Sequence, residues 1–354
     1  MNMSRIEQED FAYIVSKMDI DSFRDCSVLI TGATGFLGKY ITRFFLFLNQ
    51  REKFRIKIYI LARDLKKAED VFGINDQMVL LAGTVETYQF EMKSIDYIFH
   101  CASISNTQLF ETKPVDVITA NTIGTVNLLE LARTRNAKGV LFLSSGAVYG
   151  NSEEYAGLIG EMNSFGLCST RVSNCYAESK RMGEMLCAAY AKQYHVPAKI
   201  VRISHTYGPG INLQDGHVYS DFVTAIIKRQ DLLIKGDGQA VRPFCYVRDA
   251  LCAFLLILLK GEIGEAYNMA NSACTVSIGE LAHILVTETF AEYQLHVKFL
   301  NEEDEQNFYK RRKADMTCII DVTKLKELGW QPQVSITEGF RRTVESFEVK
   351  NENV

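Results

Sequence analysis

Tyr176 and Lys180 lie four residues apart in the segment Tyr-Ala-Glu-Ser-Lys, which opens a stretch with a helical pattern. Residues at this spacing share one face of a helix, so the ammonium group can lie beside the phenol. A cation there favours the phenolate and should lower the pKa of Tyr176 from its reference of about 10. Such a phenol can take a proton from a hydroxyl group or return one to a ketone. Ser145, at the end of a predicted strand, would hold the same oxygen from the other side.

Three glycines, Gly32, Gly35 and Gly38, follow a predicted strand that ends at Thr31, and an apolar helical pattern begins at once. Glycines at this spacing allow a tight turn, close approach of the backbone to a pyrophosphate, and packing of helix on strand. The helix N-terminus adds free N–H groups and the positive end of a dipole for the phosphates. We therefore predict a nicotinamide dinucleotide site, whose hydride chemistry complements the proton chemistry of Tyr176.

The end of the second predicted strand bears on the choice between NAD and NADP. Enzymes that use NAD usually carry an acidic residue there for the ribose hydroxyls. This sequence has Ala62 at that position, followed by Arg63 and Asp64. Because a guanidinium suits the 2′-phosphate of NADP, we favour NADP. NAD remains the alternative if Asp64 takes the acidic position, and Arg63 could also be a solvated charge that ends the strand.

Short β-rich runs alternate with longer helical patterns over the first two-thirds of the chain, which is typical of βαβ units and a parallel sheet. The predicted strands are 27–31, 57–61, 78–81, 97–101, 140–144 and 199–203, and the predicted helices are 36–49, 64–71, 114–134 and 176–194. After Ile203 the elements shorten. We predict an α/β fold with a Rossmann-type doubly wound parallel sheet and a smaller, irregular second domain.

The composition is that of a folded globular protein, with 47% hydrophobic and 23% charged residues among 354. The net charge of −4 and the lack of a basic stripe make nucleic acid an unexpected partner. The longest apolar run, 250–259, is too short for a membrane helix, and the N-terminal segment is acidic where a signal peptide would be basic. We expect a cytoplasmic protein without membrane contact.

The nine cysteines form no C-x-x-C pair, and an odd number suits neither a disulfide framework nor a zinc site. We expect reduced thiols and no metal. Residues 1–25 precede the first strand and contain one short helical pattern, 7–18. We interpret it as a cover packed on the main domain, with a partner-binding or membrane-surface helix as the alternative.

With these motifs the sequence resembles the extended short-chain dehydrogenase/reductase family, whose members act on nucleotide-linked sugars. The resemblance covers about residues 26–345, and over 175–250 it looks close to UDP-glucuronate decarboxylases. The segments that carry it are TGATGFLG (31–38), HCAS (100–103), NTIGTVNLLELA (121–132), SSGAVYG (144–150), YAESK (176–180), RISHTYGPG (202–210), GDGQAVRPFCYVRDA (236–250), EAYNMAN (265–271) and DVTKLKELGWQP (321–332).

The resemblance implies the residues that would contact each ligand. The catalytic set would be Ser145, Tyr176 and Lys180. The cofactor would contact Gly32, Thr34, Gly35, Phe36, Leu37, Gly38, Arg63, Cys101, Ala102, Ser103, Asn121, Tyr176 and Lys180. A nucleoside diphosphate sugar would contact Ser145, Gly146, Ala147, His205, Arg242 and Arg312. The two arginines are the candidates for its diphosphate, although each could instead form a surface ion pair.

The resemblance also implies how the chain is divided. A dinucleotide-binding domain would comprise residues 26–205 and 243–271, and a discontinuous substrate domain 206–242 and 272–354. Family members pair the helices that correspond to 114–134 and 176–194 across a two-fold axis. We therefore expect a homodimer.

Departures from the family pattern bear on the reaction type. Sugar 4,6-dehydratases carry Asp-Glu where this chain has Gly146 and Ala147, and UDP-glucuronate decarboxylases keep a Glu at the place of Ala147. Without a titratable group there, elimination of water has no evident acid–base pair, and decarboxylation is also disfavoured. His205 stands where the family has Asn, and we interpret it as a substrate contact rather than a second acid.

Two reactions need only hydride and proton transfer at one carbon: epimerisation at C4 and reduction of a 4-keto sugar. The sequence predicts one of these, with Arg63 favouring the reductase. Dehydratase and decarboxylase activities are the alternatives within the family. A cofactor-binding regulator without catalysis is the alternative of another class.

Overall fold

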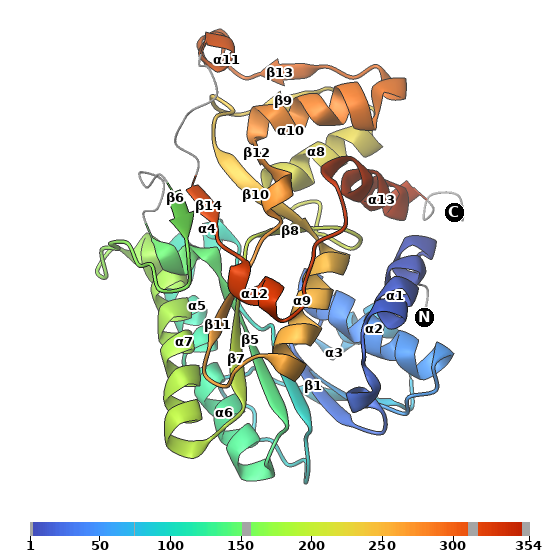
Figure 1. The fold of residues 1–354 in the computed structure, drawn as a ribbon, viewed down its shortest axis with the longest axis vertical. Helices are drawn as coiled ribbons and strands as arrows, with labels where there is room; N and C mark the ends of the chain where they lie inside the picture. The colour runs from blue at the N-terminus through green and yellow to red at the C-terminus, as the bar shows by residue number, and fades with distance from the viewer. Residues whose placement is uncertain (1–2, 74, 151–156, 311–317, 349–354) are drawn as a thin grey trace.

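A seven-stranded parallel sheet forms the centre of the larger lobe (Figure 1). The computed structural model describes residues 3–73, 75–150, 157–310 and 318–348. The strands of the sheet are β1 (Ser27–Thr31), β2 (Lys57–Ala62), β3 (Met78–Ala82), β4 (Tyr97–His100), β5 (Gly139–Ser145), β7 (Ala198–Ile203) and β11 (Ala266–Met269). Their order is β11-β7-β5-β4-β1-β2-β3, so the chain order reverses between β1 and β4. This doubly wound arrangement confirms the predicted fold class, and ligands of such sheets bind at the reversal point.

Helices cover both faces of the sheet, because successive side chains of a strand point to opposite sides. Val28 and Ile30 of β1 belong to the core on one face, and Leu29 belongs to the core on the other. The first face is covered by α2 (Phe36–Arg51), α3 (Leu65–Phe72) and α9 (Val247–Lys260), and the second by α5 (Pro114–Asn121), α6 (Ile123–Arg135) and α7 (Cys175–Tyr194).

The single helix predicted over 114–134 is two helices in the structure. The break falls at Thr122, whose backbone has φ −112° and ψ −70°. Its N–H donates to both Ile118 and Thr119, a tighter closure than a regular helix, while the Asn121 carbonyl accepts the Thr125 hydroxyl at 2.7 Å. The side chain of Thr125 thus takes part in the bonding at the break. The apolar spacing continues across it, which is why the sequence pattern concealed it.

The smaller lobe has its own apolar core, which includes Phe222, Phe244, Leu281 and Phe340. It contains a sheet of β8 (His205–Tyr207), β10 (Val241–Tyr246) and β12 (Thr275–Ser277), a pair of β9 (Leu232–Ile234) and β13 (Val297–Phe299), and the helices α8 (Val218–Ile227), α10 (Ile278–Ile284), α11 (Glu302–Lys310) and α13 (Ile336–Glu348). Three-residue strands carry too little periodicity to be recognised in a sequence. Four short elements complete the fold: α4 (Thr107–Thr112), β6 (Gly157–Ile159), its partner β14 (Cys318–Ile320), and α12 (Thr323–Glu327).

The N-terminal helix α1 (Arg5–Lys17) lies beside α2, α9 and α13 (Figure 1). At its start the Ser4 hydroxyl accepts the Glu7 N–H, and the Glu7 carboxylate accepts the Ser4 N–H. Phe11 and Ile14 are fully buried in the core that covers the sheet. This packing agrees with the interpretation of the segment as a cover. Within the described ranges, no helix is long and apolar enough to cross a membrane.

Candidate active site

The turn after β1 has no room for a side chain at Gly32 or at Gly38. Gly32 has φ +65°, in the left-handed region, and a Cβ there would lie 2.7 Å from the backbone nitrogen of Ala102. A Cβ on Gly38 would collide with the carbonyl oxygen of Gly32. Gly35 begins α2 without a side-chain cap, so the first N–H groups of this helix stay open to a ligand. Thr34 lies in the turn, and Phe36 and Leu37 form the first turn of α2; all three are half-buried.

The predicted cofactor residues after β4 lie against this glycine turn. Cys101, Ala102 and Ser103 are half-buried, and the backbone of Ala102 packs on Gly32. Asn121, at the end of α5, is fully buried and donates from Nδ2 to Ser179 Oγ at 3.0 Å. Within the described part of the chain, the buried Ser103 Oγ and Asn121 Oδ1 have no hydrogen-bond partner. Ser103 Oγ could therefore donate or accept a bond to a ligand, and Asn121 Oδ1 could accept one.

His100 holds β1, β4 and α6 together as a neutral ring. Its Nδ1 lies 3.0 Å from Thr31 Oγ1, which accepts the Ala102 N–H, and its Nε2 lies 3.1 Å from Thr125 Oγ1. Because Thr125 donates its proton to Asn121, Nε2 must be the donor and Nδ1 the acceptor. Burial, with Lys180 nearby, lowers the pKa of His100 to about 3. The ring therefore fixes the segment 101–103 without titrating near neutral pH.

The end of β2 places Arg63 and Asp64 on the surface. Ala62 is the buried last residue of the strand, and Arg63 is exposed directly after it. The Asp64 carboxylate accepts the Lys67 N–H at 2.9 Å and caps α3. Asp64 therefore has a structural partner within its own helix, whereas Arg63 is exposed directly after Ala62, which occupies the position expected for the ribose contact.

The structure brings Tyr176 and Ser145 together across the end of β5. The Ser145 side chain acts on the Tyr176 phenol in the direction that lowers its pKa, and the Tyr176 ring stacks on Phe110 with centroids 5.1 Å apart and planes 10° from parallel. Ser145 also accepts the Ala147 N–H at 3.2 Å, which fixes the turn after β5. Phe110 comes from α4, and no motif in the sequence marked it. The two hydroxyl groups are candidates for a proton relay to one substrate oxygen.

Lys180 lies beneath this pair and is almost completely buried. Its Nζ donates to the Leu143 carbonyl at 2.6 Å and lies 4.7 Å from the centre of the Phe142 ring. Burial lowers the pKa of Lys180 to about 7, against the opposing effect of Cys101 and Glu184. The amine is therefore poised to change its protonation state near neutral pH.

The expected effect of Lys180 on the tyrosine is not found. Lys180 Nζ is 5.8 Å from the centre of the Tyr176 ring and is directed to the β5 backbone. Burial raises the pKa of Tyr176, and Ser145 only partly offsets this. The expectation that Lys180 lowers this pKa is thus wrong for the protein without ligands, because desolvation outweighs a charge that is directed elsewhere.

The turn that carries Gly146 and Ala147 is open. The nearest atom to a Cβ built on Gly146 is the Ile203 carbonyl oxygen at 3.7 Å, and Ala147 is exposed. A carboxylate side chain would therefore fit at either position. Its absence is a feature of the sequence rather than a demand of the packing.

The predicted substrate residues of the smaller lobe fall on two neighbouring strands. His205 is on β8 opposite Phe244 of β10, and Arg242 lies two residues before Phe244. Burial, with Arg242 and His217 nearby, lowers the pKa of His205 to about 4, so the ring is neutral. Arg242 donates to the Val241 carbonyl at 2.9 Å. Arg312 lies outside the described residues.

A buried ionic network supports the catalytic turn, and the sequence analysis missed it. Glu184, one helical turn after Lys180, accepts the Ser144 hydroxyl at 2.6 Å and two guanidinium nitrogens of Arg202, the closer at 2.7 Å. Arg202 also donates to the Tyr149 hydroxyl at 3.1 Å. The i, i+4 spacing from Lys180 was the available signal. The network ties α7 to β5 and β7 on either side of Ser145.

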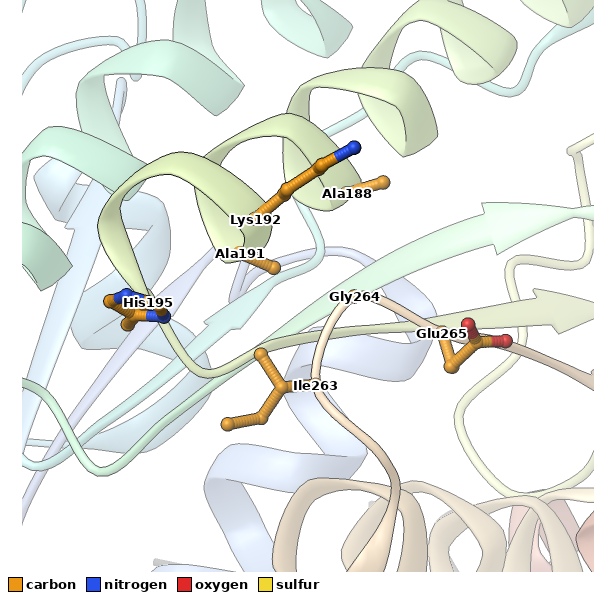
Figure 2. Close-up of a pocket in the computed structure, with 7 residues that line it drawn as sticks. All are labelled: Ala188, Ala191, Lys192, His195, Ile263, Gly264 and Glu265. Atoms are coloured by element: carbon orange, nitrogen blue, oxygen red, sulfur yellow. The ribbon is translucent and has the colours of Figure 1, made fainter.

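A shallow pocket lies at the other end of α7 (Figure 2), between the last turns of the helix and the turn before β11. It has a volume of about 410 Å³ and is lined by Ala188, Ala191, Lys192, His195, Ile263, Gly264 and Glu265. From Tyr176 to Lys192 the rise of a helix amounts to roughly 24 Å. The pocket is thus separate from the candidate active site.

The residues around the glycine turn fit a dinucleotide. Gly32 and Gly38 leave no room for a Cβ, α2 begins uncapped, and among the described residues the buried Ser103 Oγ and Asn121 Oδ1 lack partners. Such a site can hold a pyrophosphate on the helix N-terminus. Within the described ranges, no group of three His, Cys, Asp or Glu side chains could hold a metal ion.

The fold and the site define a short-chain dehydrogenase/reductase that works with a bound nicotinamide dinucleotide. More narrowly, the chain belongs to the NAD-dependent epimerase/dehydratase family, whose model matches residues 28–270. The resemblance inferred from the motifs is thereby confirmed, and with it the class of enzyme.

Similar proteins include UDP-glucuronic acid decarboxylases. The chain is 31% identical to UDP-glucuronic acid decarboxylase 1 of Xenopus tropicalis over 332 residues, 92% of this chain and 73% of the relative. It is 30% identical to UDP-glucuronic acid decarboxylase 6 of Arabidopsis thaliana over 339 residues, 91% and 89% of the two chains.

Solved structures share the fold at lower identity. A UDP-glucose 4-epimerase of Thermotoga maritima, solved with UDP-glucose, has a TM-score of 0.72 at 24% identity, covering 92% of this chain and 99% of the other. A dTDP-glucose 4,6-dehydratase of Bacillus anthracis, solved with NAD, has a TM-score of 0.70 at 22% identity, covering 92% and 98%.

Proposed function

We propose that this enzyme transfers a hydride and a proton at C4 of the sugar in a nucleoside diphosphate sugar, as a 4-epimerase or a 4-ketoreductase. The observation that carries the proposal is the Ser145–Tyr176 hydroxyl pair above buried Lys180, beside an open turn without a carboxylate at Gly146 or Ala147. The site offers one proton relay and no second acid–base pair there. Chemistry at a single carbon is what such a site supports.

In the proposed reaction Tyr176 Oη exchanges a proton with the O4 oxygen of the sugar, and Ser145 Oγ holds the same oxygen. Reduction takes a proton from the Tyr176 phenol. Oxidation requires Tyr176 as the phenolate, its own proton having passed to solvent; the phenolate then takes the O4 proton and a ketone is left at C4. The glycine turn and the start of α2 would hold the nicotinamide dinucleotide, which would supply hydride acceptance and donation at C4. Lys180, whose pKa of about 7 lets it gain or lose a proton, helps to set the charge beneath the pair.

The substrate and cofactor contacts follow from the same arrangement. We propose that His205 binds the sugar as a neutral hydrogen-bonding ring and that Arg242 and Arg312 bind the diphosphate. We retain NADP as the preferred cofactor, because Arg63 is exposed at the end of β2 while Asp64 already caps α3. NAD, the cofactor of the family, is the alternative.

Three further properties are part of the proposal. The chain would divide into a dinucleotide-binding domain, 26–205 with 243–271, and a substrate domain, 206–242 with 272–354. A homodimer would cover the apolar side chains that α5, α6 and α7 leave exposed, among them Val115, Ile123, Met182 and Met185. The eight cysteines whose side chains are described are free thiols, which suits the cytoplasm.

Decarboxylation of a nucleoside diphosphate uronic acid is the second candidate function. It is favoured by the UDP-glucuronic acid decarboxylases among the relatives, at about 30% identity. It shares the oxidation at C4, after which the β-keto acid can lose its carboxylate. The lack of a glutamate at Ala147 is what places it second.

Incubation with UDP-glucose, UDP-N-acetylglucosamine and UDP-glucuronic acid, each with NAD+ or NADP+, tests the proposal. Proton NMR should show a C4 epimer of one sugar, or a UDP-4-keto sugar supplied as a further substrate should be reduced by added NADPH, and Tyr176→Phe should abolish the change. Release of carbon dioxide from UDP-glucuronic acid would favour the second candidate. A protein that binds the cofactor but converts none of the sugars would be a regulator instead.

A further inference from the structure

A carboxylate with no exposed surface lies in the N-terminal helix α1, where the lobes meet. Asp10 accepts three hydrogen bonds: from Tyr40 Oη at 2.9 Å, from Tyr246 Oη at 2.8 Å and from Arg342 at 2.8 Å. Arg248 lies 3.9 Å away. A buried charge costs free energy unless it is paired, and here charged and hydroxyl partners supply the pairing.

The three hydrogen-bond donors belong to three different elements. Tyr40 is on α2, two residues after Gly38 of the glycine turn. Tyr246 ends β10, four residues after Arg242. Arg342 is on α13 in the smaller lobe. One side chain thus connects the helix of the proposed pyrophosphate site with the strand of a proposed substrate contact.

Helix α1 is fixed to the larger lobe by packing. The Phe11 ring lies 4.9 Å from that of Tyr40 and 5.6 Å from those of Phe44 and Phe47. Glu7 and Arg43 form a buried ion pair at 2.5 Å. These contacts hold α1 on α2 independently of Asp10.

Helix α1 also contacts α13 (Figure 1), and α13 in turn packs on the strand β10. Arg342 donates to Asp10 and lies 3.2 Å from Glu9. Phe340, two residues earlier, stacks on Tyr207 with centroids 4.2 Å apart. Tyr207 is on β8, two residues after His205. A shift of α13 relative to α1 would therefore displace the strand that carries His205.

We propose that Asp10 is a positioning residue that sets the substrate-binding strands β8 and β10 at their working distance from the glycine turn. That β8 and β10 bind substrate rests on the proposed function. That Asp10 holds the two lobes in place, the mechanical part, does not depend on it. The N-terminal helix is thus a brace between the two halves of the active site. Asp10 touches neither ligand and acts through Tyr246 and Arg342.

Hydrogen exchange of the whole protein tests the mechanical part. Asp10→Asn keeps the size of the side chain but removes its charge, and Asp19→Asn, an exposed position in the same segment, is the control. In D10N we expect faster exchange in α13 and β10, with β1, β4 and β5 unchanged. Unchanged exchange rates in α13 and β10 would contradict this role of Asp10. An equal rise of the exchange rate in the central strands would also contradict it, because it would indicate general destabilisation.

Binding of two probes tests the positioning part. We expect D10N and the milder Tyr246→Phe to weaken binding of UDP at least fivefold with NAD+ binding within twofold of wild type. Equal weakening of both probes, or no weakening of either, would overturn it. If UDP does not bind the wild-type protein, the proposed function fails, and hydrogen exchange still decides whether Asp10 braces the lobes.

Discussion

Lys180 Nζ donates to the carbonyl oxygen of Leu143 at 2.6 Å, and this bond ties the catalytic helix α7 to the end of strand β5. Tyr176 lies one turn before Lys180, and Ser145 lies two residues after Leu143. A single buried bond therefore helps to hold the two hydroxyl groups that the proposed reaction requires. It also explains why the amine is not directed at the phenol.

Replacement of Tyr176 by Phe should remove the proton relay and leave the fold intact. Positioned acid–base groups contribute about 10²- to 10⁴-fold to rate, so we expect a loss of turnover in that range. Turnover is measured on whichever UDP-sugar is converted. Tyr194→Phe, on an exposed site of the same helix, is the control and should retain wild-type activity. Near-normal turnover in Y176F would remove Tyr176 from the mechanism.

Removal of the charge of Glu184 should destabilise the protein strongly. Glu184→Gln leaves the nearly buried Arg202 without its carboxylate, and breaking a buried pair costs about 3–5 kcal/mol. Chemical denaturation measures the free energy of unfolding. Glu178→Gln on the same helix, whose partner Arg181 is 3.6 Å away and partly exposed, is the control and should lose less than about 1 kcal/mol. Similar losses of unfolding free energy in both variants would show that the Glu184 network stabilises the protein no more than a surface ion pair does.

Arg63 should distinguish the two nicotinamide cofactors. Arg63→Ala is expected to weaken the binding of NADPH about tenfold, the equivalent of about 1.4 kcal/mol, and to leave the binding of NADH nearly unchanged. Fluorescence titration of the reduced cofactors measures this. The control is Lys66→Ala, a nearby exposed cation on α3. Equal losses for NADPH and NADH would remove the reason for preferring NADP.

His100 should make the fold sensitive to acid. Its pKa of about 3 in the folded protein is below the ordinary value of 6.5, so between these values the unfolded chain binds more protons. Stability therefore falls as pH drops below 6.5. From pH 6.5 to 5 we expect wild type to lose about 2 kcal/mol more than His100→Gln, at about 1.4 kcal/mol per pH unit. Parallel stability curves for the two proteins would show that His100 is not buried as a neutral ring.

The sequence could predict the elements whose periodicity extends over a whole unit. The strands at 27–31 and 57–61 and the helix at 36–49 agree with the structure within two residues, because each strand is buried and each helix has an apolar face. The strands β8 and β12 escaped because three residues define no period. The break at Thr122 was not predicted because the apolar spacing continues across it, while the hydrogen bonds at the break leave no mark in that spacing.

The residue types of the candidate site could be predicted from the sequence, but the directions of their side chains could not. The spacing of Tyr176 and Lys180 placed both on one helical face, yet it could not show that the amine reaches Leu143. Glu184, Phe110 and Asp10 were missed because their roles depend on partners far away in the chain. Such contacts are set by tertiary packing, and only Glu184 had a local signal, its spacing of four residues from Lys180.

The proposed function confines the chemistry to C4 of the sugar, and a reaction in D2O shows whether C5 also takes part. The converted UDP-sugar is identified first, and the reaction is then run in D2O and followed by proton NMR. Elimination across C5–C6 removes the C5 proton, and decarboxylation protonates C5 from solvent. The proposed mechanism predicts a product altered at C4 with its original C5 proton retained. Deuterium at C5 would contradict it and show that a second acid–base step takes place.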